Sequence, residues 1–155
     1  MTEGYQPSHD IEHKAGRPVN WKNDLAIGKQ GESIFESFLD SFYKGNFEVK
    51  FDQYRNGRMV IETEQNPRGK GWKPSGINVT TAEWWIYLHT PQSFHAVNVK
   101  RLKHYLQKND KLSVRNFATR TENPTKGYLL LVEDVHELMN SKDYDIEEND
   151  NDKKI

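Results

Sequence analysis

The sequence predicts a single α/β domain, a layered sandwich of helices and strands. Its apolar patterns follow the order helix, strand, strand, short turn, strand, helix, strand, helix, an order typical of α/β or α+β sandwiches. The 155 residues fit one domain, and 7 Phe, 7 Tyr and 4 Trp supply large apolar area for its core. We expect a flexible N-terminal arm over residues 1–23, the folded domain over 24–140 and an acidic disordered tail over 141–155.

Three segments have the residue spacing of helices. The first begins at Asp24 and ends at Gly45, and its apolar face consists of Ile34, Phe35, Phe38, Leu39 and Phe42. A basic helix is predicted over residues 99–107, and a closing helix over residues 133–139. Residues 80–83 have the spacing of a capping box, which predicts one further helical turn.

Two neighbouring segments alternate as strands do. Residues 46–54 place Phe47, Val49 and Phe51 on one side and Glu48, Lys50 and Asp52 on the other. The pair Asn56-Gly57, favoured in tight hairpins, precedes a second strand over residues 59–65 with Glu62 and Glu64 on one face. We therefore expect these strands to be antiparallel neighbours. Further strands are predicted over residues 84–88 and 128–132, and residues 84–88 are assigned to the core.

Composition excludes several classes of protein. The chain has no cysteine, so it has no disulfide-linked partner, thiolate nucleophile or zinc–sulfur site. No apolar run approaches the ~18 residues that cross a bilayer, and the first residues lack the basic-then-apolar order of a secretory signal. We expect a soluble cytoplasmic protein without a membrane partner, located in the host cytoplasm if it is viral.

Charge is distributed unevenly along the chain. The net charge is −1, but residues 46–127 hold fourteen Lys and Arg against seven Asp and Glu, while residues 133–155 hold nine acids against three Lys. A basic body of this kind can attract phosphate whatever the sum over the whole chain. An ordinary mixed surface followed by a solvated tail explains the same counts equally well.

The polar side of the first strand forms the row Glu48, Lys50, Asp52, with Glu62 on the next strand. Phosphodiester hydrolysis by a divalent metal needs converging carboxylates, because Mg²⁺ prefers oxygen ligands, and a nearby lysine can orient water or stabilise the transition state. The simpler interpretation is the solvated face of a two-sided sheet with cross-strand ion pairs.

The order of the surrounding motifs resembles the PD-(D/E)XK nuclease superfamily, in particular its small viral and phage members related to Holliday-junction resolvases. The resemblance covers about residues 24–132. Its motifs are Gly28-Lys29-Gln30-Gly31-Glu32, Phe47-Glu48-Val49-Lys50-Phe51-Asp52, Met59-Val60-Ile61-Glu62, Lys73-Pro74-Ser75-Gly76-Ile77, Thr80-Thr81-Ala82-Glu83-Trp84-Trp85 and Thr125-Lys126-Gly127-Tyr128-Leu129.

This resemblance implies a restriction-endonuclease-like mixed β-sheet flanked by helices, Mg²⁺ (or Mn²⁺) as cofactor and DNA as substrate. It implies that Glu48 and Lys50 form the (D/E)-x-K pair, with Glu32 as the helix carboxylate and Glu62 as the acid of the following strand. Ser75 and Gly76 match a substrate-facing turn. Resolvases of this fold act as symmetric dimers, so the resemblance also implies a homodimer.

One metal-binding Asp of the family has no clear counterpart. The family carries it on a strand between the first helix and the E-x-K strand, where this chain has too few residues for a strand. Asp40 lies near the required offset but at the end of the helix. Either that strand is lost, or Asp52 takes its role, with Glu62 and Glu64 as an E-x-E variant. The residues expected to bind the metal are Glu48, Asp52 and Glu62.

The basic loop over residues 66–76 is a candidate nucleic-acid contact. Arg68, Lys70 and Lys73 lie there beside Trp72, a combination that can grip phosphates and stack a base, although a solvated loop has the same composition. The predicted function is a metal-dependent endonuclease acting on branched or structured DNA. The alternatives are a nuclease-fold protein that binds DNA or protein without cutting, and a virion or host-takeover protein that acts through its surface.

Overall fold

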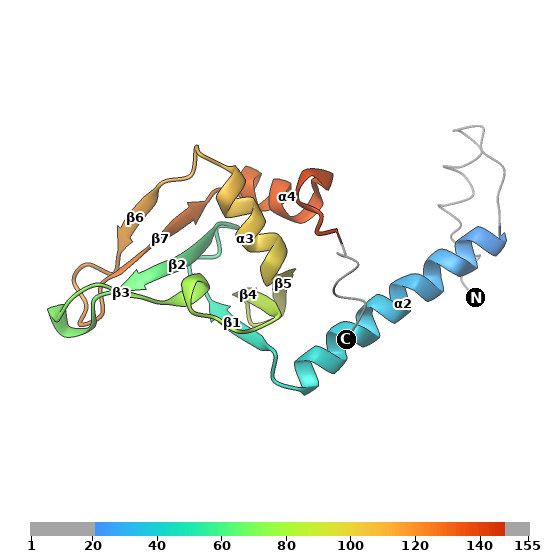
Figure 1. Cartoon of the computed structure of the whole chain (residues 1–155), viewed down its shortest axis with the longest axis horizontal. Coiled ribbons are helices and arrows are strands. Elements are labelled where there is room, and N and C mark those ends of the chain that lie inside the picture. Colours follow the sequence, from blue (N-terminus) through green and yellow to red (C-terminus); the bar gives the residue numbers. More distant parts are fainter. Residues whose placement is uncertain (1–20, 148–155) are drawn as a thin grey trace. The chain divides into compact units, whose positions relative to one another are not determined.

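The computed structural model describes residues 21–147, in two units that divide after Asp40. The first unit contains most of helix α2 (Trp21–Tyr43), which begins three residues before the predicted start. The second contains two β-sheets and the remaining helices (Figure 1). The chain is mixed α/β, as its sequence predicts, but its strands form two sheets. Residues 1–20 of the expected arm and residues 148–155 of the expected tail lie outside the described part.

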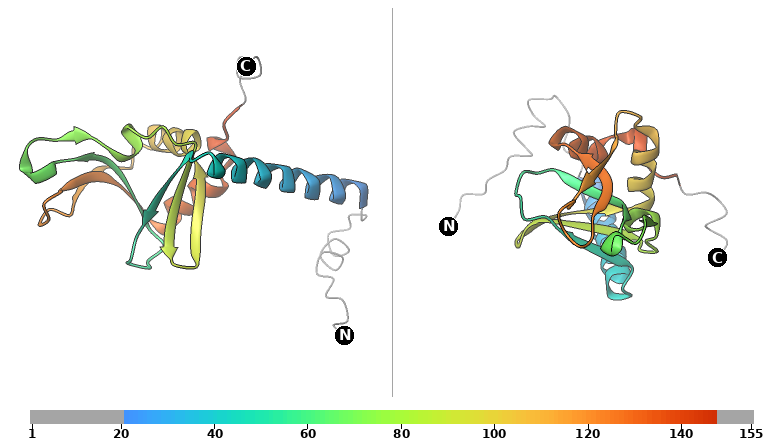
Figure 2. Two further views of the ribbon diagram at one scale, coloured as in Figure 1. Left: turned by 90° about the horizontal axis from the view of Figure 1, so that it is seen from below. Right: turned by 90° about the vertical axis from the view of Figure 1, so that its left-hand side faces the viewer.

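The two sheets differ in strand direction. In the first, β1 (Phe47–Phe51) runs parallel to β4 (Trp84–Thr90), which is antiparallel to β5 (Ser93–Asn98). In the second, all pairs are antiparallel, in the order β3 (Lys73–Pro74), β2 (Met59–Gln65), β7 (Thr125–Leu130) and β6 (Val114–Phe117). Figure 2 shows the two sheets of the second unit extending in different directions.

The expected antiparallel pairing of the strands over residues 46–54 and 59–65 is wrong. β1 pairs with β4, and β2 pairs with β7, so the two strands belong to different sheets. The Asn56-Gly57 pair does form a turn, in which Asn56 Oδ1 accepts the Arg58 N–H at 3.0 Å, but the turn directs the chain from one sheet to the other. In the observed pairing Met59 and Ile61 of β2 are fully buried, and burial of such apolar side chains favours it.

The core lies between the sheets and the helices α3 (Val99–Lys108) and α4 (Val132–Asn140), which confirm the two later helices predicted from the sequence. Its largest fully buried side chains are Trp85, Tyr105, Met59, Ile61, Leu102, Leu130, Leu138 and Val97. Of residues 84–88, assigned to the core, Trp85, Ile86 and Tyr87 are buried, whereas Trp84 and Leu88 are partly exposed. The helical turn expected over residues 80–83 is absent, and Thr80 Oγ1 instead accepts the Ala82 N–H at 3.2 Å.

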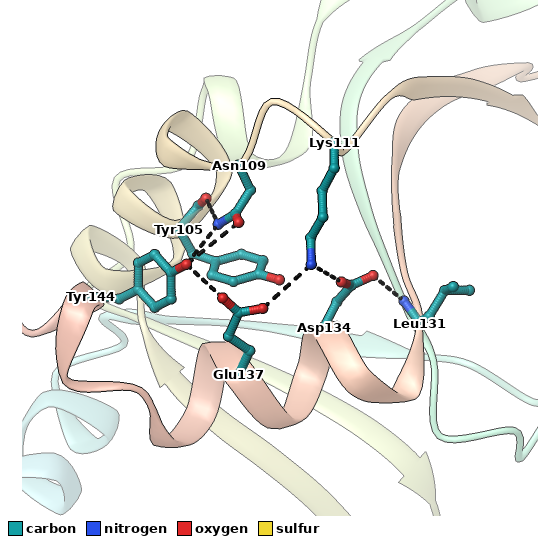
Figure 3. Close-up of polar contacts among 7 residues, drawn as sticks. All are labelled: Tyr105, Asn109, Lys111, Leu131, Asp134, Glu137 and Tyr144. Carbon is teal, nitrogen blue, oxygen red and sulfur yellow. Dashed lines mark hydrogen bonds and ion pairs between the residues drawn. The ribbon is translucent and has the colours of Figure 1, made fainter.

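Residues 141–147, expected to belong to a disordered tail, pack on the folded body. The short helix η3 (Lys142–Tyr144) buries Tyr144, whose hydroxyl donates to Glu137 Oε1 at 2.8 Å (Figure 3). Glu137 and Asp134 both form ion pairs with Lys111, at 3.4 and 3.1 Å, and Asp134 also caps α4 through the Leu131 N–H. The buried Tyr144 therefore extends the folded structure past residue 140, where the acidic composition had suggested that disorder begins.

Leu130 and Leu131 provide a matched test of this core. Leu130 is 0% exposed in β7, whereas Leu131 is 41% exposed at the start of α4. We expect Leu130→Ala to lower the free energy of unfolding by about 2–5 kcal/mol, because the truncation leaves a cavity. Leu131→Ala should cost less than about 1 kcal/mol. Urea unfolding measures both, and equal losses would contradict the assigned register of β7.

Candidate functional site

The polar row of β1 faces the interior of its unit. Val49 and Phe51 are 46% and 53% exposed, whereas Glu48 and Lys50 are half-buried. Lys50 Nζ lies 2.7 Å from Glu48 Oε1 and 5.3 Å from the centre of the Trp85 ring. A solvated sheet face would show the reverse exposure, because its apolar residues would be the covered ones. The ion pair and the aromatic ring together hold the Lys50 ammonium in place.

Asp52 follows β1 and is held by two donors. Its Oδ1 accepts the Tyr54 N–H at 2.9 Å, and its Oδ2 accepts the Tyr87 hydroxyl at 3.1 Å. The Tyr87 oxygen in turn accepts the Val60 N–H at 3.1 Å. Tyr87 therefore connects the end of β1 with the start of β2, in the other sheet.

The Tyr87 phenol stays neutral over the physiological pH range. It is 3% exposed, and burial raises its pKa to about 12; the Val60 N–H bond opposes this shift, and the Asp52 carboxylate adds to it. The neutral phenol donates a hydrogen bond to the Asp52 carboxylate and carries no negative charge of its own. Tyr87 therefore orients this carboxylate without itself attracting a cation.

An open groove of about 840 Å³ collects three of the predicted site residues. Lys50 and Asp52 come from β1 and its end, Glu62 comes from β2, and Tyr87 lies between them on β4. The lining also includes the last residue of β6, the loop that follows it and the first residue of β7: Phe117, Ala118, Thr121 and Thr125. Residues from both sheets thus line one concave surface of the second unit.

Glu62 and Glu64, expected on one face of their strand, lie in different grooves. A β-bulge shifts the pairing of β2 with β7 between these two residues, and a bulge redirects the side chains that follow it. Glu64 lines a separate pocket and lies 3.7 Å from Lys126 Nζ through its Oε2. Only Glu62 of the pair therefore faces Lys50 and Asp52 across the groove.

Three further residues considered for the site, Glu48, Glu32 and Asp40, do not line the groove. Glu48 does not line it but contacts Lys50 directly. Glu32 is an exposed residue of α2 in the first unit, and Asp40 is the last residue of that unit. The structure therefore places Lys50, Asp52 and Glu62 on the lining of one groove and pairs Glu48 with Lys50.

Ser75 and Gly76 are fixed against β2 next to Glu62. The Ser75 N–H donates to Thr63 O at 2.9 Å, and Ser75 is buried. Gly76 has a φ of +54°, and a Cβ at this position would overlap the backbone carbonyl of Glu62. Only glycine fits there, so Gly76 has a packing role that supports the position of Glu62.

The basic loop lies at the end of the β2–β3 pair. Arg68, Lys70 and Lys73 are exposed, as a phosphate contact requires. The Trp72 ring, in contrast, has Lys126 Nζ 4.0 Å from its centre. This cation occupies one face of the indole, so that face is not open to a nucleic-acid base.

Neither Tyr87 as a site residue nor the pairing of His89 with His95 was predicted from the sequence. His89 Nε2 lies 2.8 Å from His95 Nδ1, and burial together with His89 lowers the pKa of His95. The alternation of residues 87 and 89 on one strand, followed by a tight turn and residue 95, is the pattern that could have indicated this cluster.

Within residues 21–147, no three His, Asp or Glu side chains lie close enough together to hold a metal ion by themselves. Among the same residues, no helix is long and apolar enough to cross a membrane. No family model, curated protein or solved structure matches this chain. What the groove does must therefore be inferred from its own chemistry.

The link through Tyr87 predicts a specific dependence of stability on pH. Because the pKa of Tyr87 is raised from 10.0 to about 12 on folding, its contribution is complete below pH 10 and is lost as pH rises toward 12. We expect Tyr87→Phe to cost about 1–3 kcal/mol at neutral pH, since it leaves the Val60 N–H without its acceptor.

The same variant should lose less stability than the wild type between pH 10 and 12. Denaturant unfolding at several pH values measures this slope, and Tyr54→Phe, at an exposed tyrosine, is the control. An unchanged slope in Tyr87→Phe would show that another group carries the alkaline loss.

Proposed function

We propose that this chain is a divalent-metal-dependent endonuclease that hydrolyses branched or structured DNA in the groove between its two sheets. The observation that carries the proposal is the convergence of Lys50, Asp52 and Glu62, which come from different sheets, on one open groove. The proposal includes a restriction-endonuclease-like core, to which we assign the mixed sheet β1-β4-β5. It also includes action in the cytoplasm, that of the host if the protein is viral.

Asp52 and Glu62 would hold the metal. Mg²⁺ is commonly bound through one or two carboxylates, with water and substrate phosphate completing its coordination, so two carboxylates in an open groove suit Mg²⁺ or Mn²⁺. When bound, such an ion supplies a hydroxide nucleophile and neutralises charge on the phosphate. The hydrogen bond from Tyr87 leaves Asp52 with further lone pairs for this role.

Lys50 would stabilise the negative charge that develops on the phosphate. Its ammonium lines the groove, and its contacts with Glu48 and Trp85 restrict its movement. Preorganised charge of this kind contributes more than a mobile one, because no reorganisation is needed during the reaction. The ion pair favours Glu48 as a positioning residue for Lys50 over the direct metal ligand that the resemblance implies.

A second candidate function is DNA binding without hydrolysis. It is favoured because no three His, Asp or Glu side chains among residues 21–147 lie close enough together to hold a metal ion. The two candidates share the groove and the basic loop and differ only in whether a metal ion in the groove activates water.

Cleavage of a four-way junction and of linear DNA, with and without Mg²⁺ or Mn²⁺, tests the proposal. We expect metal-dependent cutting that falls about 100-fold or more in Lys50→Ala and in Glu62→Gln, because each removes a group that acts on the transition state. Glu64→Gln is the matched control, since it makes the same change two residues away in a different pocket. DNA binding without cutting under either metal would favour the second candidate.

DNA affinity should depend on the basic loop in either case. We expect the triple substitution Arg68→Ala, Lys70→Ala, Lys73→Ala to weaken binding to all sequences and to reduce the slope of log affinity against log salt by about 2 to 3. A charge-matched control replaces Lys100, Lys108 and Lys142, three exposed lysines of α3 and η3. Equal losses of DNA affinity in both triple variants would show that the loop is not part of the binding surface.

A further inference from the structure

Two histidines meet across the hairpin that joins β4 to β5. His89 Nε2 lies 2.8 Å from His95 Nδ1, and the two ring planes are nearly perpendicular, at 89°. Both side chains are half-buried, and neither lines the groove that carries the proposed reaction. The pair is therefore a cluster of nitrogen ligands that this reaction does not use.

An irregularity in strand pairing brings the two rings together. His95 lies opposite Tyr87 in the pairing of β4 with β5, and the register shifts between Leu88 and Thr90. His89 is thus the extra residue of β4 in a β-bulge, and a bulge redirects the side chain of its extra residue. Bulges of this kind are frequent next to functional sites.

The hairpin holds the two imidazoles close to the arrangement in which they meet. In its turn, Thr90 Oγ1 accepts the Gln92 N–H at 3.1 Å and shares a hydrogen bond with Ser93 Oγ at 2.8 Å. The Tyr87 ring lies beside His89, with 5.3 Å between the ring centres. Ligand groups held in this way lose little freedom when they bind an ion.

The two facing nitrogens share a single proton, because in the neutral pair one nitrogen donates and the other accepts. Burial, and then the neighbouring His89, lower the pKa of His95, so this imidazole is neutral at pH 7. Neutral imidazole is the commonest protein ligand of transition metals. A divalent ion can take the place of the shared proton if the donating ring moves its proton to its outer nitrogen, and no proton is then released.

The separation of the two nitrogens indicates the class of ion. Ligands at about 2.0 Å from a metal lie about 2.8 Å apart when the angle at the metal is about 90°, and about 3.3 Å apart at the tetrahedral angle. The observed 2.8 Å matches adjacent positions of a square-planar or tetragonal ion, the geometry of Cu²⁺ and Ni²⁺, better than those of tetrahedral Zn²⁺. Mg²⁺ is a poor fit, because it prefers oxygen ligands.

We propose that His89 and His95 form a chelating site for a tetragonal divalent transition-metal ion, Cu²⁺ or Ni²⁺. Within residues 21–147 no third His, Asp or Glu completes the site, so water would occupy the other positions of the ion. Each imidazole turns to direct its lone pair at the ion, while the strands keep their separation. The site is independent of the groove, whose carboxylates suit Mg²⁺ or Mn²⁺.

Calorimetric titration of the full chain with Cu²⁺ and with Ni²⁺ tests the site. All proteins carry His9→Ala/His13→Ala, because these two histidines outside the described residues are four positions apart, a spacing found in metal-binding pairs. We expect one ion per chain, bound about tenfold or more weakly after His89→Ala or His95→Ala. His136→Ala, at an exposed histidine of α4, is the matched control and should leave the affinity unchanged.

The electron paramagnetic resonance spectrum of the bound Cu²⁺ reports its ligands without any change at the site. We expect a tetragonal signal with two nitrogen ligands, and one nitrogen ligand in each single variant. A spectrum without two nitrogens, no saturable binding of one ion, or unchanged affinity in His89→Ala overturns the proposal. We also expect Ni²⁺ to bind more tightly than Zn²⁺, and the reverse order overturns the tetragonal geometry.

Discussion

The Tyr87 hydroxyl connects two strands that belong to different sheets, and the groove depends on this connection. It donates to Asp52 at the end of β1 and accepts from the backbone of Val60 in β2. A buried phenol can satisfy both groups only if the strands keep their present separation, because hydrogen bonds weaken steeply with distance and angle. Asp52 and the backbone of Val60, two residues before Glu62, are thus linked through a residue that is itself part of the core.

The inward direction of the polar row on β1 is energetically unfavourable, and it is this direction that places Lys50 in the groove. Half-burying Glu48 and Lys50 while leaving Val49 and Phe51 exposed opposes the usual distribution of polar and apolar groups. The ion pair and the Trp85 ring offset part of that cost. Proteins accept such local conflicts mainly where a site requires them, which is the physical basis for assigning function to this strand.

Much of the fold could be predicted from local patterns. Helices α3 and α4 and strand β2 appear where periodicity places them, because each buries one apolar face whatever its neighbour is. Strands β5 and β6 were missed, since they are short and weakly alternating. β1 pairs with β4, and each residue of β1 lies opposite the residue 37 positions later in the chain. No local pattern indicates this pairing, which follows from the burial of both faces of β4.

The residues of the candidate site could be proposed from the sequence, but their arrangement could not. Sequence alone determined that Glu48, Lys50 and Asp52 alternate on one side of a strand and that Glu62 follows on the next, because alternation and residue type are properties of the chain itself. The tertiary structure alone decided that a bulge removes Glu64 from the groove, that Glu48 contacts Lys50 and that Tyr87 orients Asp52. These outcomes depend on which strands meet, and strand pairing is set by the packing of the whole core rather than by any segment within it.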